Sequence, residues 1–134
     1  MAIDPVTRDM SVDAFLESYY QALRDGEPLE PFFARDHRAV KFGITESLHG
    51  YAEIEDGLTA QTATTTDWSI RSHRLETDTA GEVGWFSDHV TMRWRDIEAD
   101  EQLEWETRWS GTVLHVDSDW QFVRMHVSAA HEST

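Results

Sequence analysis

The chain has 134 residues, no cysteine and a formal net charge of −15, from 26 acidic and 11 basic side chains. That length fits one domain with its own core, and the missing cysteine excludes disulfides, thiolate metal sites and cysteine nucleophiles. A surface this acidic repels phosphate backbones, so we expect no nucleic-acid binding. There is no apolar run near the ~18 residues of a membrane span and no basic-then-apolar leader, so we expect a cytoplasmic protein that avoids membranes.

The basic residues are unusual in kind. Lys41 is the single lysine, and the other ten basic residues are arginines. The acidic residues are scattered along the chain, which argues against a disordered acidic tail. This composition is typical of a salt-loving microbe with a salty cytoplasm, where screening reduces the self-repulsion of the folded protein. An ordinary acidic protein is the alternative.

The first half of the chain has helical patterns and one short strand. Residues 12–24 carry apolar side chains at helical spacing, with Ser11 as the N-cap. A short second helix is predicted at about 28–34, and a third, weaker one at about 51–63. Between them, residues 37–44 alternate like a strand. Its two alternating sets are Val40, Phe42 and Ile44 against Ala39, Lys41 and Gly43.

The second half predicts four long strands, at 68–77, 82–95, 102–116 and 120–128. The turn segments between them are T-D-T-A-G, D-I-E-A-D-E and D-S-D. Helices followed by an antiparallel meander predict a single α+β domain, with its core at about residues 10–128.

One long segment carries a family resemblance. Residues 108–128 read R-W-S-G-T-V-L-H-V-D-S-D-W-Q-F-V-R-M-H-V-S, with weaker support from F-F-A-R-D-H and from Gly50 before the third helix. This pattern, with the element order, resembles the SnoaL-like group of the nuclear-transport-factor-2-like (NTF2-like) superfamily, a relative of the calcium/calmodulin-dependent kinase association domain. The resemblance implies helices packed on a strongly curved antiparallel sheet, which together form a cone around a cavity.

The last strand has two unequal faces. One face carries Gln121, Val123, Met125 and Val127, and the other carries Trp120, Phe122, Arg124, His126 and Ser128. Because the second face changes from aromatic to polar along its length, we expect it to line the cavity. His126 is then a candidate proton shuttle, and Arg124 a candidate ligand-binding residue. The alternatives are a histidine that bonds only the backbone, and an arginine paired with an acid or water.

Asp88 is the candidate general base. By alternation it shares a face with Phe86, Val90, Met92 and Trp94, and desolvation makes a carboxylate more basic. SnoaL-like cyclases and ketosteroid isomerases use this residue type to remove a proton beside a carbonyl, so the resemblance implies that role. The alternative is an ion pair with Arg108 or Arg124, which would leave Asp88 without catalytic function.

Three further residues are candidate ligand contacts. Tyr19 lies on the apolar face of the first helix, where its hydroxyl needs a partner. Arg108 matches the arginine of the family pattern, although strict alternation puts it on the more polar face unless the strand has a bulge. Trp85 is a candidate stacking residue, with a core or interface position as the alternative. The seven histidines show no metal-ligand spacing, so we expect neither a metal nor a cofactor.

Three functions remain open at this point. The first is a small-molecule-binding protein with an internal pocket for a hydrophobic or carbonyl-containing ligand. The second is a cofactor-free isomerase or cyclase that uses Asp88, and the third is an assembly domain without catalysis. Trp94, Trp105 and Trp109 offer more aromatic surface than one core needs, so we expect a homodimer.

Overall fold

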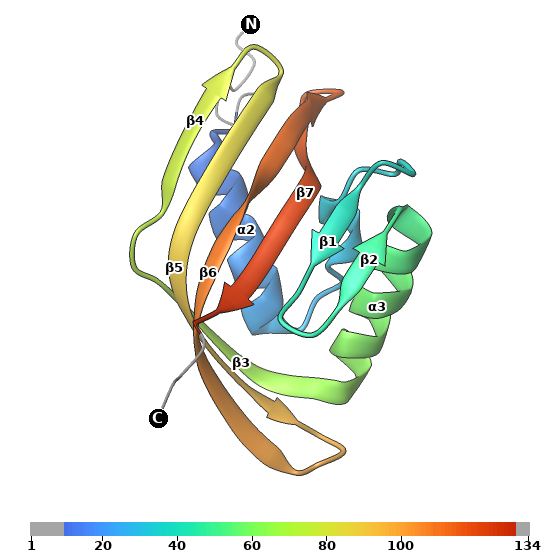
Figure 1. Cartoon of the computed structure of the whole chain (residues 1–134), viewed down its shortest axis with the longest axis vertical. Helices are drawn as coiled ribbons and strands as arrows, with labels where there is room; N and C mark the ends of the chain where they lie inside the picture. The colour runs from blue at the N-terminus through green and yellow to red at the C-terminus, as the bar shows by residue number, and fades with distance from the viewer. Residues whose placement is uncertain (1–9, 131–134) are drawn as a thin grey trace, which may run out of the picture.

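A computed structural model describes residues 10–130 (Figure 1). The order of the elements is as follows: helix α2 (Val12–Asp25), the 3-10 helix η1 (Glu30–Phe32), strands β1 (Val40–Phe42) and β2 (Ser47–His49), helix α3 (Tyr51–Thr64), and strands β3 (Thr65–Ser72), β4 (Glu76–Ala80), β5 (Val83–Asp96), β6 (Glu101–Val116) and β7 (Asp119–Ala129). Neither α-helix in this part of the chain has the length and apolar character needed to cross a membrane.

Helix α2 begins and ends where its sequence predicts. The Ser11 hydroxyl accepts a hydrogen bond from the backbone N–H of Ala14 at 3.2 Å, which satisfies one free donor of the first turn. At the other end, Gly26 adopts a left-handed conformation with φ of 68° and closes the helix. The apolar face of α2 packs across the sheet, and its buried residues are Val12, Phe15, Leu16, Tyr19, Tyr20, Ala22 and Leu23.

The strands form one seven-stranded sheet in the order β2-β1-β7-β6-β5-β3, with β4 paired to the first half of β5. All pairings are antiparallel except β1 with β7, which is parallel. The sheet curves strongly, so that α2 lies against its concave side and α3 lies beside β1 and β2 (Figure 1). This is the α+β cone that the sequence predicts.

Three elements differ from the sequence-based prediction. The second helix is only a 3-10 turn, since Pro31 follows Glu30 and the chain extends again at Phe33. Strand β2 was not predicted. The predicted strand at 68–77 is instead two strands, because the chain leaves the sheet between Ser72 and Glu76 and β4 then pairs with the other half of β5.

Strand β7 contains the feature that overturns the predicted faces. Thr112 pairs with Arg124 but Val113 pairs with Phe122, so Val123 is an extra residue that forms a β-bulge. The extra residue reverses the alternation. Phe122 is buried before the bulge, whereas Met125 and Val127 are buried after it. The predicted inward orientation of Arg124 and His126 is therefore wrong, because both lie exposed on the convex face of the sheet.

Gly111 makes this bulge possible. A Cβ atom at this position would overlap the carbonyl oxygen of Arg124 and would contact the Phe86 ring. Only glycine lets β6 and β7 approach so closely there.

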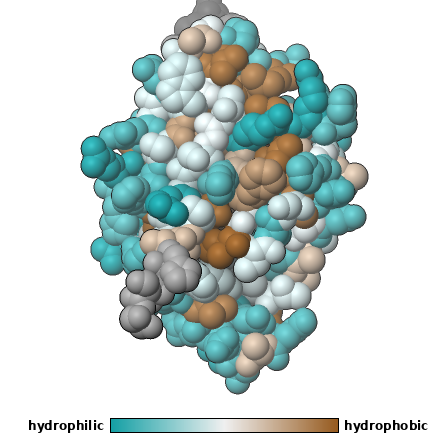
Figure 2. Space-filling view, in the orientation of Figure 1, coloured by the Kyte–Doolittle hydropathy of each residue, from teal (hydrophilic) through white to brown (hydrophobic). Residues whose placement is uncertain are grey.

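The convex face exposes fewer tryptophans than the sequence suggested. In Figure 2 this face carries hydrophilic, pale and hydrophobic residues side by side. Trp109 is buried and belongs to the core, and Trp94 is partly buried against Trp68, so neither supplies the exposed aromatic surface that was expected. Trp105 is 39% exposed and Trp85 is 45% exposed.

Candidate functional site

A cavity of about 320 Å³ lies on the concave side of the sheet. We call it the cone cavity. It is enclosed by α2, the β1–β2 hairpin, α3 and the concave faces of β3, β5, β6 and β7. Its wall is mostly apolar and aromatic, with a few polar groups, which is the usual composition of a small-ligand site. The apolar wall includes Leu23, Ile44, Trp68, Met92, Trp94, Trp109, Met125 and Val127.

An ion pair stands in this wall. Lys41 Nζ donates a hydrogen bond to Glu46 Oε1 at 2.6 Å, and both residues line the cone cavity. Only 7% of the Lys41 side chain is exposed, against 32% of Glu46. An ammonium group has three donors, and Glu46 accepts one of them. Two donors of Lys41 therefore remain for a ligand or water, since no other acceptor for it lies among residues 10–130.

Lys41 was not predicted as a site residue, because the alternation of the strand suggested that the opposite face is buried. The pattern suggested that Val40, Phe42 and Ile44 form the apolar face, but in the structure Ala39 and Lys41 are buried and Phe42 is 38% exposed. The reason is the position of β1 at the side of the cone. There its inner face meets Met125 of β7, and Phe42 packs on the convex side against the His126 ring at 5.8 Å.

Tyr19 supplies the second polar group of the cavity. The residue is 2% exposed and lines the cavity, yet its hydroxyl forms no hydrogen bond with any residue in the range 10–130. Its ring is fixed by edge-on contacts with Phe32, Phe122 and Trp109. Burial, and then the nearby charge of Glu46, raise the pKa of Tyr19 well above its usual value. The hydroxyl therefore stays protonated and can donate to a ligand oxygen.

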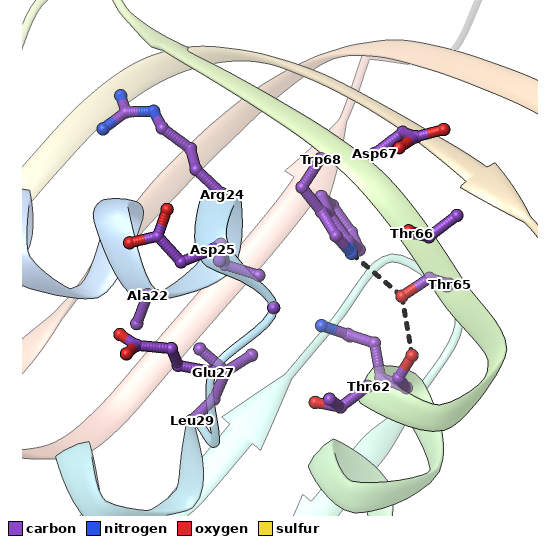
Figure 3. Close-up of a pocket in the computed structure, with 13 residues that line it drawn as sticks. Ala22, Arg24, Asp25, Glu27, Leu29, Thr62, Thr65, Thr66, Asp67 and Trp68 are labelled. Carbon is purple, nitrogen blue, oxygen red and sulfur yellow. Dashed lines mark hydrogen bonds between the residues drawn. The ribbon is translucent and has the colours of Figure 1, made fainter.

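A smaller hollow of about 170 Å³ adjoins the cone cavity at the end of α2 (Figure 3). The two share four lining residues, which are Leu23, Gln61, Thr65 and Trp68. The Trp68 ring is held between them. Its Nε1 donates to Thr65 Oγ1 at 2.9 Å, and its ring stacks on Trp94 at 4.9 Å. A bulge in β3, with Asp67 at φ of 57°, turns Trp68 toward this position.

Asp88 is buried as predicted, but it does not line the cone cavity. Its carboxylate accepts three hydrogen bonds, from the Tyr20 hydroxyl at 2.8 Å, the Ser72 hydroxyl at 2.6 Å and the Arg74 backbone N–H at 2.9 Å. We call this the Asp88 network. The predicted ion pair with Arg108 or Arg124 is absent from the described residues. Neutral donors stabilise the carboxylate instead.

The other predicted site residues lie on the convex face. Arg108 and His126 line a groove of about 440 Å³ together with Asp88, His89 and Ser110, so three of the predicted residues meet there. Arg124 donates to the backbone carbonyls of Arg38 and Val123. Trp85 is exposed on the same face. Of the six predicted residues, Tyr19 is therefore the one that lines the cone cavity. No group of three His, Asp or Glu side chains within residues 10–130 is arranged to hold a metal ion.

The sequence contained a signal for the missed pair. Lys41 is the only lysine in the chain and stands within a strand pattern, five residues before Glu46 across a tight hairpin. A lone lysine in a protein that otherwise uses arginine is unusual in composition alone. Its position facing a carboxylate across a hairpin could have marked it as a site residue.

Comparison with known proteins agrees with this architecture. The sequence pattern of the SnoaL-like domain matches residues 12–132. The chain belongs to the SnoaL-like family. No curated protein is similar enough in sequence to count as a match.

Solved structures show the same fold at low sequence identity. An NTF2-like superfamily protein from Salmonella enterica superposes with a TM-score of 0.81 at 12% identity, covering 98% of this chain and 96% of that one. A ketosteroid isomerase-like protein from Erwinia carotovora gives 0.74 at 12% identity, covering 90% and 95%. A protein with a cystatin-like fold from Caulobacter vibrioides gives 0.73 at 17% identity, covering 90% and 87%. At these identities the likeness concerns the fold alone.

Proposed function

We propose that this SnoaL-like protein binds a small, mostly apolar organic molecule in the cone cavity, with an oxygen of the ligand at the Tyr19 hydroxyl. The observation that carries the proposal is a donor at the cavity surface without a protein acceptor. Tyr19 is almost fully buried, its hydroxyl stays protonated, and no residue within 10–130 accepts its hydrogen bond. No fully buried side-chain polar atom among the described residues lacks a partner, so the Tyr19 hydroxyl is accessible from the cavity. It can therefore donate to a ligand oxygen or to water there.

The wall of the cavity favours a flat ligand. Trp68 and Trp94 stack on each other with ring planes 16° apart and present an aromatic surface, while Met92 and Met125 provide adaptable apolar contacts. An aromatic ketone combines a flat apolar body with one accepting oxygen, so it matches both parts of the site.

Isothermal titration calorimetry with acetophenone and 2-acetonaphthone tests this proposal. We expect saturable binding of at least one of them to the wild type. Tyr19→Phe should weaken it about three- to tenfold, the value of one hydrogen bond. Arg108→Gln, on the convex face, is the matched control and should leave the affinity unchanged. Binding that is lost in Arg108→Gln and kept in Tyr19→Phe would place the ligand outside the cavity.

A cofactor-free isomerase is the alternative function, with a change of the proposed base. Because the Asp88 oxygens are occupied by three donors, proton abstraction falls instead to Glu46, whose charge acts on Tyr19. Glu46 would take a proton from the carbon beside the ketone, and Tyr19 would stabilise the enolate oxygen. Return of the proton to another carbon of a conjugated ligand would complete an isomerisation, whereas in 2-acetonaphthone the proton can return only to the same carbon, which gives hydrogen exchange. In D₂O buffer that contains the protein, the acetyl group of 2-acetonaphthone would then exchange hydrogen for deuterium faster than in the same buffer without protein. Equal exchange rates with and without protein would exclude this function for that ligand.

A homodimer remains our proposal for the partner. The exposed Trp85 on β5 and Phe42 on β1 lie on the convex face, and exposed apolar side chains on an open sheet face favour association. Light scattering should return about twice the monomer mass of 15.5 kDa. A Trp85→Ser, Phe42→Ser double variant should return the monomer mass. A wild type that is monomeric at high concentration would contradict the dimer.

Salt adaptation and a cytoplasmic location also remain proposals, and both rest on composition. The net charge of −15 predicts that the free energy of unfolding rises between low and molar salt, because screening reduces repulsion among the carboxylates. Urea unfolding at several salt concentrations measures this. A free energy of unfolding that stays constant or falls with salt would count against adaptation to a salty cytoplasm.

A further inference from the structure

The charges in the wall of the cone cavity balance. Among the residues that line it, Lys41 and Glu46 are the charged ones, and they neutralise each other at 2.6 Å. A ligand that enters the cavity loses much of its hydration shell. A carboxylate ligand would need an uncompensated cation to replace that shell, whereas an uncharged ligand needs only hydrogen-bond donors. Because Glu46 already compensates Lys41, the wall offers donors without net positive charge.

The position of Glu46 is built into the hairpin. The Gly43 N–H donates to the Glu46 carbonyl at 2.9 Å and closes the turn between β1 and β2. The Glu46 side chain then folds back over Gly43. A Cβ atom at Gly43 would lie 2.7 Å from Glu46 Cγ and 2.9 Å from Glu46 Oε1, so the glycine leaves room for the Glu46 side chain beside Lys41. The hairpin therefore accommodates Glu46 at Lys41.

The surroundings of the cavity also disfavour anions. The adjoining hollow is bordered by Asp25, Glu27 and Asp67, and Arg24 is the one cation among its lining residues (Figure 3). Two donors of the Arg24 guanidinium are already bound to protein acceptors, because it donates to Gln21 Oε1 at 3.0 Å and to the Ile70 carbonyl at 2.8 Å. The negative potential of this region, and of the chain as a whole, adds to the repulsion of an anionic ligand.

We propose that Glu46 is the specificity-determining residue of the cone cavity, and that by neutralising Lys41 it makes the cavity select uncharged carbonyl ligands over carboxylates of the same shape. This inference rests on the proposed function, because it concerns the ligand of that same site. It assigns Lys41 the role of a hydrogen-bond donor and Glu46 the role of an excluder of anions.

Two pairs of nearly isosteric probes test the selection. Acetophenone is paired with benzoate and 2-acetonaphthone with 2-naphthoate, so that each pair differs by a methyl group in place of a charged oxygen. Calorimetric titration of the wild type should show that the ketone binds at least about tenfold more tightly than its carboxylate, since a desolvated charge without a partner costs more than one hydrogen bond gains.

Two variants should move the selectivity in opposite directions. Glu46→Gln keeps the shape and an acceptor for Lys41 but removes the negative charge, so 2-naphthoate should bind about 10- to 100-fold more tightly than to the wild type. Lys41→Met keeps Glu46 and leaves the wall negative, so 2-naphthylmethylammonium should bind more tightly and 2-naphthoate should not bind. Asp78→Asn replaces an exposed carboxylate on β4 and should leave all the affinities unchanged.

Circular dichroism verifies that each variant folds. If Glu46→Gln does not fold, the binding of 2-naphthylmethylammonium to Lys41→Met tests the role of Glu46 instead.

The outcomes separate this inference from the proposed function. If the wild type binds neither member of either pair, the proposed function fails and the inference fails with it. If the wild type binds the ketones and carboxylates equally, the cavity binds ligands but does not select by charge. If the selectivity is unchanged in Glu46→Gln, Glu46 does not determine the specificity, although the proposed function still holds. The same conclusion follows from an unchanged selectivity in Lys41→Met if Glu46→Gln does not fold.

Discussion

Within residues 10–130, the buried charged side chains Asp88 and Lys41 differ in how completely the protein satisfies them. The Asp88 network is closed, because three donors from α2, the end of β3 and the β3–β4 connection occupy its carboxylate oxygens. The Lys41–Glu46 pair is open, because each group satisfies the other only in part and both face the cone cavity. The comparison indicates that burial of a charged residue does not by itself mark a functional site. Hydrogen-bonding capacity left for a ligand is the better indicator.

The largest expected effect concerns the closed site. Asp88→Ala removes the acceptor of Tyr20, Ser72 and the Arg74 N–H, leaving one buried and two partly buried donors without their partner. We expect a loss of about 3 to 5 kcal/mol in the free energy of unfolding, measured with urea. Glu104→Ala, an exposed carboxylate on β6, is the control and should change stability by less than about 0.5 kcal/mol. If Asp88→Ala were as stable as the control, Asp88 would have no structural role.

Alkaline pH separates the two sites next, because each contains a tyrosine. Burial raises the pKa of both Tyr19 and Tyr20 above the ordinary value of 10.0, and for Tyr20 the hydrogen bond to Asp88 adds to the effect. Below pH 10 both the folded and the unfolded chain hold these protons, so they cause no pH dependence. Above it the unfolded chain releases them first, and stability should fall by about 1.4 kcal/mol per pH unit for each tyrosine.

Variants assign that slope to the two tyrosines. Tyr19→Phe and Tyr20→Phe should each reduce the alkaline dependence of the free energy of unfolding by about one proton. Urea unfolding at a series of pH values above 10 measures it. The absorbance of tyrosinate reports how many tyrosines are ionised in the folded wild type. If Tyr19 and Tyr20 were both ionised at pH 10, the burial of both hydroxyls would be contradicted.

A smaller effect is expected at the open site, and it should be asymmetric. Glu46→Gln leaves the more buried partner, Lys41, without its counter-charge and should cost about 1 to 2 kcal/mol. Lys41→Met leaves a carboxylate that water can reach and replaces a buried amine with an apolar side chain. Its free energy of unfolding should change by less than about 1 kcal/mol. If Lys41→Met were the costlier of the two, the ion pair would be a structural element like the Asp88 network.

The smallest effects are expected on the convex face. Arg108→Gln and His126→Gln change exposed side chains that line the convex groove outside the cone cavity, so each should alter stability by less than about 0.5 kcal/mol and leave ketone binding unchanged. Urea unfolding and calorimetric titration measure both quantities. A loss of ketone affinity in His126→Gln would restore the catalytic role first predicted for that residue.

The sequence predicted the fold better than the site, and the reason is physical. The three last strands, the Ser11 cap and the alternation around Asp88 are local patterns, and all of them are confirmed. The orientation of Arg124 and His126 depended instead on one extra residue, Val123, which reverses every side chain after it. The pattern of alternation cannot locate a bulge, because the bulge forms only where Gly111 of the neighbouring strand lets the backbones approach.

Lys41 was missed for a related reason. Its inward orientation depends on the parallel pairing of β1 with β7, which brings the middle of a three-residue strand over Met125. A strand that short has too few residues for alternation to indicate which face is buried. Tyr19, in contrast, was found because a 14-residue helix fixes its buried face over several turns.

A crystal structure of the protein grown with 2-acetonaphthone tests the central claim most directly. The account predicts the naphthalene ring beside Trp68, Trp94 and Met92 in the cone cavity, with the ketone oxygen within hydrogen-bonding distance of the Tyr19 hydroxyl or of Lys41 Nζ. Ligand density in the convex groove beside Arg108 and His126, with a cone cavity that holds only water, would contradict it.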